Sequence, residues 1–261
     1  MGEEDHDEET VKLLSYAIFI VGYYLLRAFF SLPQNGRFYI SFLNVGQGDA
    51  FVISIPSYGR ALIDAGADYQ SNYLSARTSI LPVCNIKSIF ITHYDNDHAG
   101  GLERISKFCR NVTVYDNLSY GDVVDFGVAK LYVLSPLKKN STHQENNDSL
   151  VMLLKYHDFE ALLTGDAGLD VLEPVGKIIK EYKSNGTISG DLDVYKASHH
   201  GSLHNSSKNL VDELKPTYCL ISVGENNYGH PSKDVIKDLT RAGCRVQRTD
   251  TDGTTTFYGI F

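Results

Sequence analysis

The chain has 261 residues, of which 43% are hydrophobic and 21% are charged, a composition typical of a globular protein that can bury a full core. Its formal net charge is −8, but six acidic residues lie within the first ten positions. From Arg37 onward there are 22 basic and 26 acidic residues, a net charge of −4. Composition therefore gives no sign of the wide basic face that many nucleic-acid-binding proteins present.

The N-terminal region divides into an acidic tail at residues 1–10 and an apolar helix predicted at residues 11–32. The stretch from Leu13 to Leu26 is uncharged, and counted through Arg27 it approaches the roughly 20 residues that cross a bilayer. We therefore predict a membrane anchor. The side of the membrane is left open, because basic residues flank the segment at both ends. An amphipathic or core-packing helix is the alternative, since the uncharged stretch falls short of a full span.

Residues 37–261 are predicted to form one domain that begins with strands and continues with strands and helices in turn. Strands are expected at residues 38–45, 50–55, 60–63, 86–92, 112–115, 130–134, 150–156, 160–163, 194–197 and 217–223, and helices at residues 99–108, 167–182, 209–214 and 231–242. Residues 245–261 have the pattern of a closing hairpin around a turn at residues 251–253. This order predicts an α/β (α+β layered) fold in which two sheets pack together and helices cover the outside.

The four cysteines are Cys84, Cys109, Cys219 and Cys244, and they stand far apart without CxxC spacing. This spacing indicates neither a zinc ribbon nor a small disulfide scaffold. Three of the four lie in or beside apolar runs, so we interpret them as buried thiols. The redox compartment is left open.

The segment THYDNDHAGG at residues 92–101 follows a predicted strand and places two histidines and two aspartates within six positions. On a loop after a strand, His93 and Asp95 can point to one side. Asp97 and His98 then point to the other, which suits two cations held a few ångströms apart. The alternative is a solvated turn in which Asp97 caps the next helix, but four ligand-type side chains exceed what a cap requires.

Three more polar segments follow strands later in the chain. Asp166 stands where a strand turns into a helix, the pair His199 and His200 follows a short strand, and Tyr228 and His230 precede another helix. Each is weak evidence by itself, because a histidine pair at a strand end is often a core or surface feature. The segments become specific only in combination.

In combination, these segments resemble the metallo-β-lactamase superfamily, and within it the soluble domain of ComEC-type competence proteins and its stand-alone relatives. The motifs that carry the resemblance are VGQGDA at residues 45–50, LIDAG at 62–66, HYDNDHAGG from His93, NDSL at 147–150, TGDAG around Asp166, HHGS from His199 and NYGHPS around His230. Together they span most of residues 37–261. The resemblance implies an αββα sandwich with the active site at one edge.

The resemblance also implies a ligand set. One metal would be held by His93, Asp95 and one of the paired histidines, for which we favour His200. The other metal would be held by Asp97, His98 and His230, and Asp166 would bridge the two metals. The superfamily more often has histidine at Asp95, whereas the ComEC-like branch resembles this chain in carrying aspartate. His199 would then touch the substrate, although the choice between His199 and His200 stays open. Asp49 and Asp64 are expected to orient ligands and neighbouring loops, or else to be simple turn residues.

No thiolate enters this set, and the extra carboxylate makes the site harder, so we expect two divalent ions, either zinc or manganese. Two cations that share a water lower its pKa from roughly 15.7 to near 7 and stabilise the oxyanion formed when it attacks an ester. Asp97 would act at the metals. His199 or Tyr228 would steady a phosphoryl oxygen or protonate the leaving group, which makes the chain a metal-dependent hydrolase.

The leading hypothesis is phosphodiester hydrolysis, with single-stranded DNA or another polynucleotide as the substrate class that the resemblance implies. The metals and a local basic strip such as Lys138, Lys139 and Lys196 would then offset the acidic body. The second hypothesis is a small phosphate ester, choline-phosphate ester or lactone as substrate, which fits the net charge better. The third is a membrane-tethered binding protein whose metal cluster is only structural.

Overall fold

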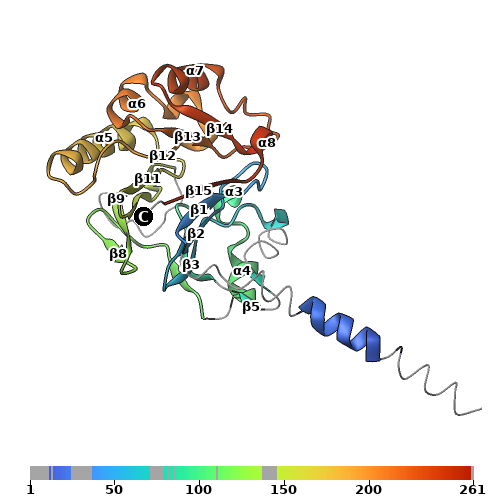
Figure 1. The fold of residues 1–261 in the computed structure, drawn as a ribbon. Coiled ribbons are helices and arrows are strands. Elements are labelled where there is room, and N and C mark those ends of the chain that lie inside the picture. The colour runs from blue at the N-terminus through green and yellow to red at the C-terminus, as the bar shows by residue number, and fades with distance from the viewer. Residues whose placement is uncertain are drawn as a thin grey trace, which may run out of the picture.

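The computed structural model describes residues 12, 14–24, 37–70, 79, 80, 83, 84, 86–109, 111–136 and 146–259. Two sheets pack face to face, and helices cover their outer faces (Figure 1). The predicted layered α+β sandwich is therefore confirmed.

The first sheet has six strands. In spatial order they are β15 (Thr255–Tyr258), β1 (Tyr39–Phe42), β2 (Phe51–Ile55), β3 (Gly59–Ile63), β6 (Ile86–Phe90) and β7 (Thr113–Tyr115). Pairing is antiparallel from β15 to β3, and β6 and β7 continue the sheet in parallel. A separate pair is formed by β4 (Ser79–Ile80) and β5 (Val83–Cys84).

The second sheet has seven strands. In spatial order they are β14 (Arg245–Arg248), β13 (Tyr218–Ile221), β12 (Val194–Lys196), β11 (Phe159–Leu163), β10 (Val151–Tyr156), β9 (Ala129–Ser135) and β8 (Val123–Asp125). The strands from β8 to β11 are antiparallel, whereas β11, β12, β13 and β14 run parallel. The carboxyl ends of these four parallel strands therefore meet at one edge of the sheet.

Both faces of each sheet are buried, because successive side chains of a strand point to opposite faces. On β2, Phe51 and Ile53 belong to the core between the sheets, and Val52 packs in the cluster on the outer face. On β10, Met152 faces the core between the sheets and Leu153 packs on the helix side. A strand that is buried on both faces requires a continuous run of apolar residues.

The helices lie on the two outer faces and in the connecting loops. They are α3 (Asn96–Ala99) and α4 (Leu102–Phe108) beside the first sheet, α5 (Leu169–Ser184), α6 (Lys208–Leu214) and α7 (Lys233–Arg241) over the second, and α8 (Thr249–Asp252). Single 3₁₀ turns are η1 (Asp68–Gln70), η2 (Asn146–Asp148), η3 (His199–Gly201) and η4 (Leu203–Asn205). Side-chain caps set the starts of two helices: Ser207 Oγ accepts from Leu210 N at the start of α6, and Ser232 Oγ accepts from Asp234 N at the start of α7.

The prediction of a closing hairpin at residues 245–261 is wrong. β14 extends the second sheet next to β13, whereas β15 joins the first sheet next to β1. The reason is the connection between them, which is helical and anchored at buried Thr249. Its Oγ1 accepts a hydrogen bond from Val223 N at 2.8 Å and donates one to Val223 O at 2.9 Å, which directs the chain from one sheet to the other.

The interpretation of the cysteines as free thiols is also wrong. Cys84 is joined to Cys109, and Cys219 to Cys244, with Cα–Cα distances of 4.9 and 5.8 Å. The partners are 25 residues apart in each case. Sequence spacing alone does not predict such pairs, because strand pairing and helix packing bring the partners together.

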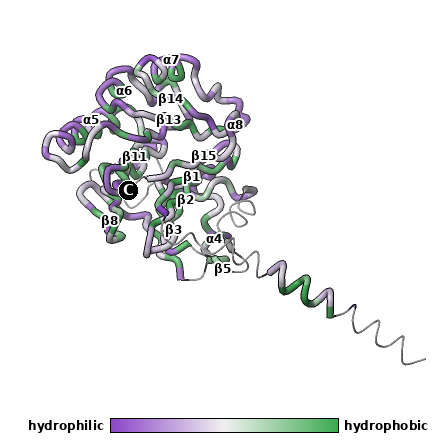
Figure 2. Tube along the Cα trace, in the orientation of Figure 1, coloured by the Kyte–Doolittle hydropathy of each residue, from purple (hydrophilic) through white to green (hydrophobic). Residues whose placement is uncertain are grey.

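The N-terminal helix is described at residues 14–24, and its apolar side chains, such as Leu14 and Phe19, are exposed. Figure 2 shows it as an isolated hydrophobic segment. The remainder of the predicted helix at residues 11–32, apart from residue 12, lies outside the described residues. None of the helices in the described ranges combines the length and the apolar character that crossing a bilayer requires.

Candidate metal centre

The predicted site residues lie on loops at one edge of the sandwich. The loop after β6 carries His93, and the loops after β11 and β12 carry Asp166 and His200. Because β11 and β12 are parallel neighbours, the residues that follow them end up side by side. The first sheet contributes Asp64, which follows β3 directly beside the end of β6.

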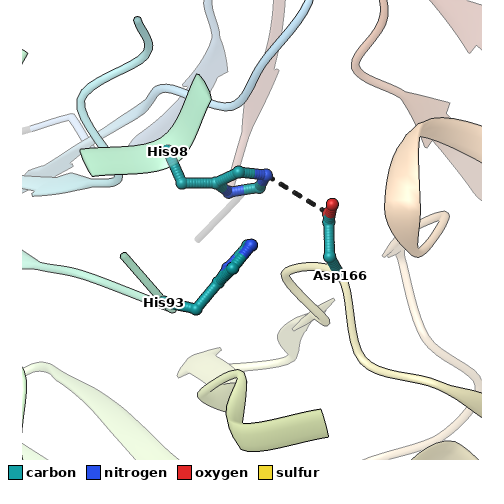
Figure 3. Close-up of side chains that lie close together, drawn as sticks. All are labelled: His93, His98 and Asp166. Carbon is teal, nitrogen blue, oxygen red and sulfur yellow. Dashed lines mark ion pairs between the residues drawn. The ribbon is translucent and has the colours of Figure 1, made fainter. Parts of the chain in front are cut away.

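Figure 3 shows the first group of ligand-type side chains, His93, His98 and Asp166. The distance from His98 Nε2 to Asp166 Oδ1 is 3.3 Å, and the two imidazole centroids lie 4.1 Å apart. All three residues are buried. Three such donors at this spacing can hold one divalent cation.

The second group consists of Asp97, His98 and His200. His200 Nε2 lies 3.2 Å from Asp97 Oδ2 and 3.5 Å from Asp166 Oδ2. The two oxygens of Asp166 thus face different histidines, which is the placement that a bridging carboxylate needs. The structure brings His200 to Asp97 and His98, whereas the expected grouping set it with His93 and Asp95.

Hydrogen bonds behind the histidines fix their orientation. His98 Nδ1 donates to Asp64 Oδ2 at 2.9 Å, and Asp64 in turn accepts from Thr92 N at 2.8 Å and from Thr92 Oγ1 at 2.7 Å. His200 Nδ1 donates to Ser222 O at 2.7 Å. Each bond leaves Nε2 as the nitrogen that faces the centre, as supporting contacts of metal-binding histidines do.

Lys196 is a buried cation beside the centre. Its Nζ lies 2.6 Å from Asp49 Oδ2 and 3.6 Å from Asp166 Oδ1, and it donates to Gly165 O at 2.8 Å. The side chain is fully buried, so the prediction that Lys196 belongs to a basic surface strip is wrong. Lys138 and Lys139, the other members of that strip, lie outside the described residues.

The charges of the centre shift the pKa values of its members. Burial lowers the pKa of His98, but the carboxylates of Asp166, Asp49 and Asp64 outweigh burial and raise it well above its ordinary value. Burial likewise opposes the shift of His200, whose pKa is raised by the carboxylate of Asp166 and by the adjacent carboxylate of Asp97.

Two other members of the centre shift downward. Burial would raise the pKa of Asp97, but the adjacent His200 and the charge of His98 lower it to about 2. For His93, burial and the neighbouring His98 lower the pKa. Without a cation, protons on His98 and His200 therefore compensate the carboxylates.

The donor set fits a divalent metal. The Nε2 atoms of His93, His98 and His200 are buried and have no hydrogen-bond partner within the described part of the chain. Buried imidazole nitrogens without a partner are costly, and cations held by the two groups would satisfy all three. Nitrogen and carboxylate donors without a thiolate are compatible with zinc and with manganese.

The remaining predicted residues line the opening of a cavity of about 630 Å³ above the centre. Asp95 Oδ2 lies 3.5 Å from His93 Nε2. His199 Nε2 lies 3.7 Å from Asp166 Oδ2, and the rings of His199 and His230 are 5.2 Å apart. His230 thus lies beside His199, not in either ligand group, and Tyr228 stands at the rim.

The backbone at the histidine pair explains why His200, and not His199, points inward. Both residues adopt left-handed conformations, with φ of +48° and +52°, and Gly201 follows at +79°. Left-handed backbone at non-glycine residues is unfavourable and recurs at functional sites. It turns His200 into the core, while the side chain of His199 stays 30% exposed at the cavity, which favours His200 as the ligand.

A family model of the metallo-β-lactamase superfamily matches residues 43–204, more than half of the chain. That range contains both ligand groups described above. The chain belongs to the metallo-β-lactamase superfamily. Membership of this superfamily points to a metallo-hydrolase, and the chain is similar to competence proteins.

Curated relatives of this superfamily member include two proteins of bacterial competence and recombination. The chain is 26% identical to ComE operon protein 3 of Bacillus subtilis over 88% of its own length and 34% of that protein. It is 29% identical to Recombination protein 2 of Haemophilus influenzae over 81% of its length and 27% of that protein. The chain therefore spans only about a third of the length of these relatives.

Solved structures support the fold. The metallo-β-lactamase fold protein YhfI from Bacillus subtilis matches with a TM-score of 0.56 at 10% identity, covering 85% of this chain and all of that one. A CmlA β-hydroxylase variant matches with a TM-score of 0.53 at 13% identity, covering 86% and 54%. At these identities the likeness shows the fold alone.

The roles of several contributors to the site were not predicted from the sequence. Thr92, Ser222 and the buried Lys196 act through hydrogen bonds that only the fold reveals. Asn226 is a further case, since its side chain binds the backbone around His230. For Lys196, its place in an apolar strand directly before the histidine pair was a usable signal.

Proposed function

We propose that this protein hydrolyses phosphodiester bonds, with a polynucleotide as the substrate class and with the N-terminal helix holding it at a membrane. The observation that carries the proposal is a set of buried imidazole nitrogens without hydrogen-bond partners, which lie beside carboxylates at and beneath the floor of a cavity that opens to solvent. The similarity to competence and recombination proteins supports a nucleic-acid substrate.

The ligand groups define where metal would be held. One cation would be held by His93, His98 and Asp166, with Asp95 nearby. A second cation would be held by Asp97 and His200, together with either His98 or Asp166. When bound, divalent cations lower the pKa of water toward neutrality and neutralise negative charge that develops on a phosphoryl oxygen. Zinc and manganese both remain compatible with these donors.

The chain's own groups supply orientation and proton handling. Asp97, with its low pKa of about 2, stays ionised at neutral pH and can accept a hydrogen bond from a water molecule in the cavity. His199 stands at the opening, 3.7 Å from Asp166 Oδ2, where its imidazole can donate to a phosphoryl oxygen or to the leaving oxygen.

A small phosphate ester is a second candidate substrate, favoured by the charge of the cavity. Among the described residues that line it, four are acidic and none is lysine or arginine. Polynucleotide binding usually relies on basic side chains that neutralise several phosphates. A substrate with one phosphate would not need them.

One experiment separates these candidates. The full-length protein, loaded with Mn²⁺ or Zn²⁺, is incubated with labelled single-stranded DNA and with bis-p-nitrophenyl phosphate, with Asp97→Ala as the control. Cleavage of both supports the polynucleotide reading, and cleavage of the small ester alone replaces it with the second candidate. No metal-dependent turnover on either substrate would overturn the proposed function.

The membrane role is tested separately. Flotation with vesicles of mixed zwitterionic and anionic lipids should carry the wild-type protein to the lipid fraction. The double variant Ile18→Asp/Ile20→Asp should remain in the dense fraction, because a charge at the centre of an apolar segment opposes insertion. Equal flotation of the two proteins would exclude the helix as the anchor.

A further inference from the structure

The loop at residues 224–231 is held rigid by one side chain, Asn226. Its amide nitrogen donates to Gly224 O at 2.9 Å and to His230 O at 2.8 Å, and its amide oxygen accepts from Tyr228 N at 3.0 Å and from His230 N at 3.1 Å. These four bonds use both donors and both lone-pair positions of the amide. The backbone of Tyr228 is therefore fixed before any ligand binds.

This fixed loop presents an aromatic ring to the cavity. The Tyr228 side chain lines the cavity and is 77% exposed, and its ring lies 5.9 Å from that of His230. Tyr69, on the turn η1 that follows β3 of the first sheet, lines the same cavity and is 74% exposed. The solvent-exposed ring of Tyr228, carried on a rigid backbone, is suited to stacking against a flat ligand group.

The charge of the cavity narrows the ligand further. Because none of the described residues that line the cavity is lysine or arginine, they offer flanking phosphates no permanently charged cation. Binding energy beyond the metal centre must then come from uncharged parts of the substrate. Base stacking on aromatic rings is such a contribution and does not depend on sequence.

We propose that Tyr228, together with Tyr69, stacks an unpaired nucleobase next to the scissile phosphodiester, so that the substrate is single-stranded nucleic acid. This inference rests on the proposed function and specifies its substrate class. This role uses the ring face of Tyr228 and replaces the role at the phosphoryl or leaving oxygen that the sequence suggested for Tyr228, so that His199 alone keeps that role and the Tyr228 hydroxyl is dispensable. The inference also accounts for the rigid mount that Asn226 provides.

The test compares two polymers that carry the same phosphodiester linkages, an oligothymidylate and an abasic oligomer of equal length. Tyr228→Ala should lower kcat/KM on oligothymidylate by about tenfold, within the range known for loss of a stacked base, and leave the abasic oligomer unaffected. Tyr228→Phe should behave as wild type on both. Tyr258→Ala, an exposed tyrosine on β15 outside the cavity lining, serves as the matched control.

Several outcomes would overturn the stacking role. An equal loss on both polymers would make Tyr228 a positioning residue for His230, and a loss in Tyr228→Phe would show that the hydroxyl is used. Unchanged rates in Tyr228→Ala would remove the residue from substrate binding while leaving the nuclease proposal intact. If wild-type protein cleaves bis-p-nitrophenyl phosphate but neither polymer, the polynucleotide proposal itself falls.

The two disulfides carry an independent inference. All four cysteines of the sequence are paired. Cys109, Cys219 and Cys244 are buried, so the pairs are internal cross-links. Cytosolic reductants keep thiols reduced, whereas disulfides persist in extracytoplasmic proteins. We infer that the domain acts in an oxidising compartment, on the non-cytoplasmic side of a membrane.

This inference is tested in cells that make the protein naturally. Cells are quenched with acid, and the denatured protein is treated with a maleimide that adds mass to each free thiol. Without a reductant, no maleimide addition is expected, and after reduction four additions are expected. In the double variant Cys84→Ser/Cys109→Ser, only two additions are expected after reduction. Protease added to intact spheroplasts should also digest the domain. Additions before reduction, or protection from the external protease, would overturn the placement.

Discussion

The floor and the mouth of the cavity differ in how the chain holds their polar groups. We call the buried centre beneath the cavity its floor: His93, His98, Asp166 and His200, of which the last two line the cavity. The mouth consists of Asp95, His199, Tyr228 and His230, which all line it. Floor side chains are buried and oriented by buried partners such as Asp64 and Ser222. Mouth side chains are partly or largely exposed.

This difference separates two kinds of contribution. Burying polar groups without partners destabilises a fold, so the floor couples metal binding to stability. The mouth residues are in contact with water, and their replacement costs the fold little. Changes in the floor should therefore alter both metal content and stability, and changes in the mouth should alter only turnover.

Asp97 lies between the two regions and gives the largest expected effect. Its side chain is 33% exposed but contacts His200. We expect Asp97→Ala to lower kcat/KM by about 1,000-fold or more, because a group that acts on developing charge is lost, while the protein stays folded. Rate assays and circular dichroism on the same sample measure both.

The control for Asp97 is Asp212→Ala, an exposed acid on α6 that should leave turnover unchanged. An Asp97→Ala protein that fails to fold would favour the remaining alternative, a binding protein whose metal cluster is only structural. It would also erase the distinction between floor and mouth at this position.

Lys196 tests the floor through stability. Lys196→Met leaves Asp49 buried without its cation, and breaking a buried ion pair costs about 3–5 kcal/mol. Urea unfolding of the metal-free protein measures the loss. Lys155→Met is the matched control, since Lys155 is partly exposed and its partner Glu160 keeps its bonds from Ser189. That variant should lose about 1 kcal/mol, and equal losses would contradict a special role for the Lys196 pair.

The fold was largely predictable because its signals are local. Alternating and continuous apolar runs gave the strands of both sheets, as β2 and β10 illustrate. The prediction of a hairpin at residues 245–261 was wrong because the sheet that each strand joins depends on the contact between Thr249 and Val223, which lie 26 residues apart. The disulfides were not predicted for the same reason, because their partners are also distant in the sequence.

The site was predictable only where the donors themselves form motifs. His93, Asp97 and Asp166 stand out by residue type at strand ends. The hydrogen-bond partners that orient the histidines do not stand out in the sequence. Asp64 is 34 residues away from His98, and Ser222 is 22 residues away from His200. The grouping of His200 with Asp97 likewise follows from the left-handed backbone at the histidine pair.

His199 probes the mouth with an effect of intermediate size. His199→Ala should lower kcat/KM by about a hundredfold, the contribution of one hydrogen-bond donor or acid in the transition state. Metal content, measured by elemental analysis after dialysis, should match the wild type. His200→Ala should instead lose metal. The reverse pattern would place His199 in the floor and His200 in the mouth.

Proton linkage gives the smallest effect and reports on the floor without any substitution. The pKa values of His98 and His200 are raised above the ordinary histidine value by Asp166 and other carboxylates that outweigh burial. Both imidazoles are therefore more than half protonated at pH 6.5 in the metal-free protein. A metal requires them neutral, so binding should release about one to two protons per chain from these two residues, whereas His93, whose pKa is lowered, should contribute less than half a proton.

The affinity for a divalent cation should then rise with pH, by up to about tenfold per pH unit for each proton released, and level off once the pH exceeds the folded-state values. Calorimetric titration with Mn²⁺ or Zn²⁺ at pH 6.5 in two buffers of different ionisation enthalpy counts the protons. Binding that releases none would mean that the buried histidines are neutral before the metal arrives. Their carboxylate neighbours would then have to be compensated by Lys196 alone, and Lys196→Met should shift metal affinity more than stability.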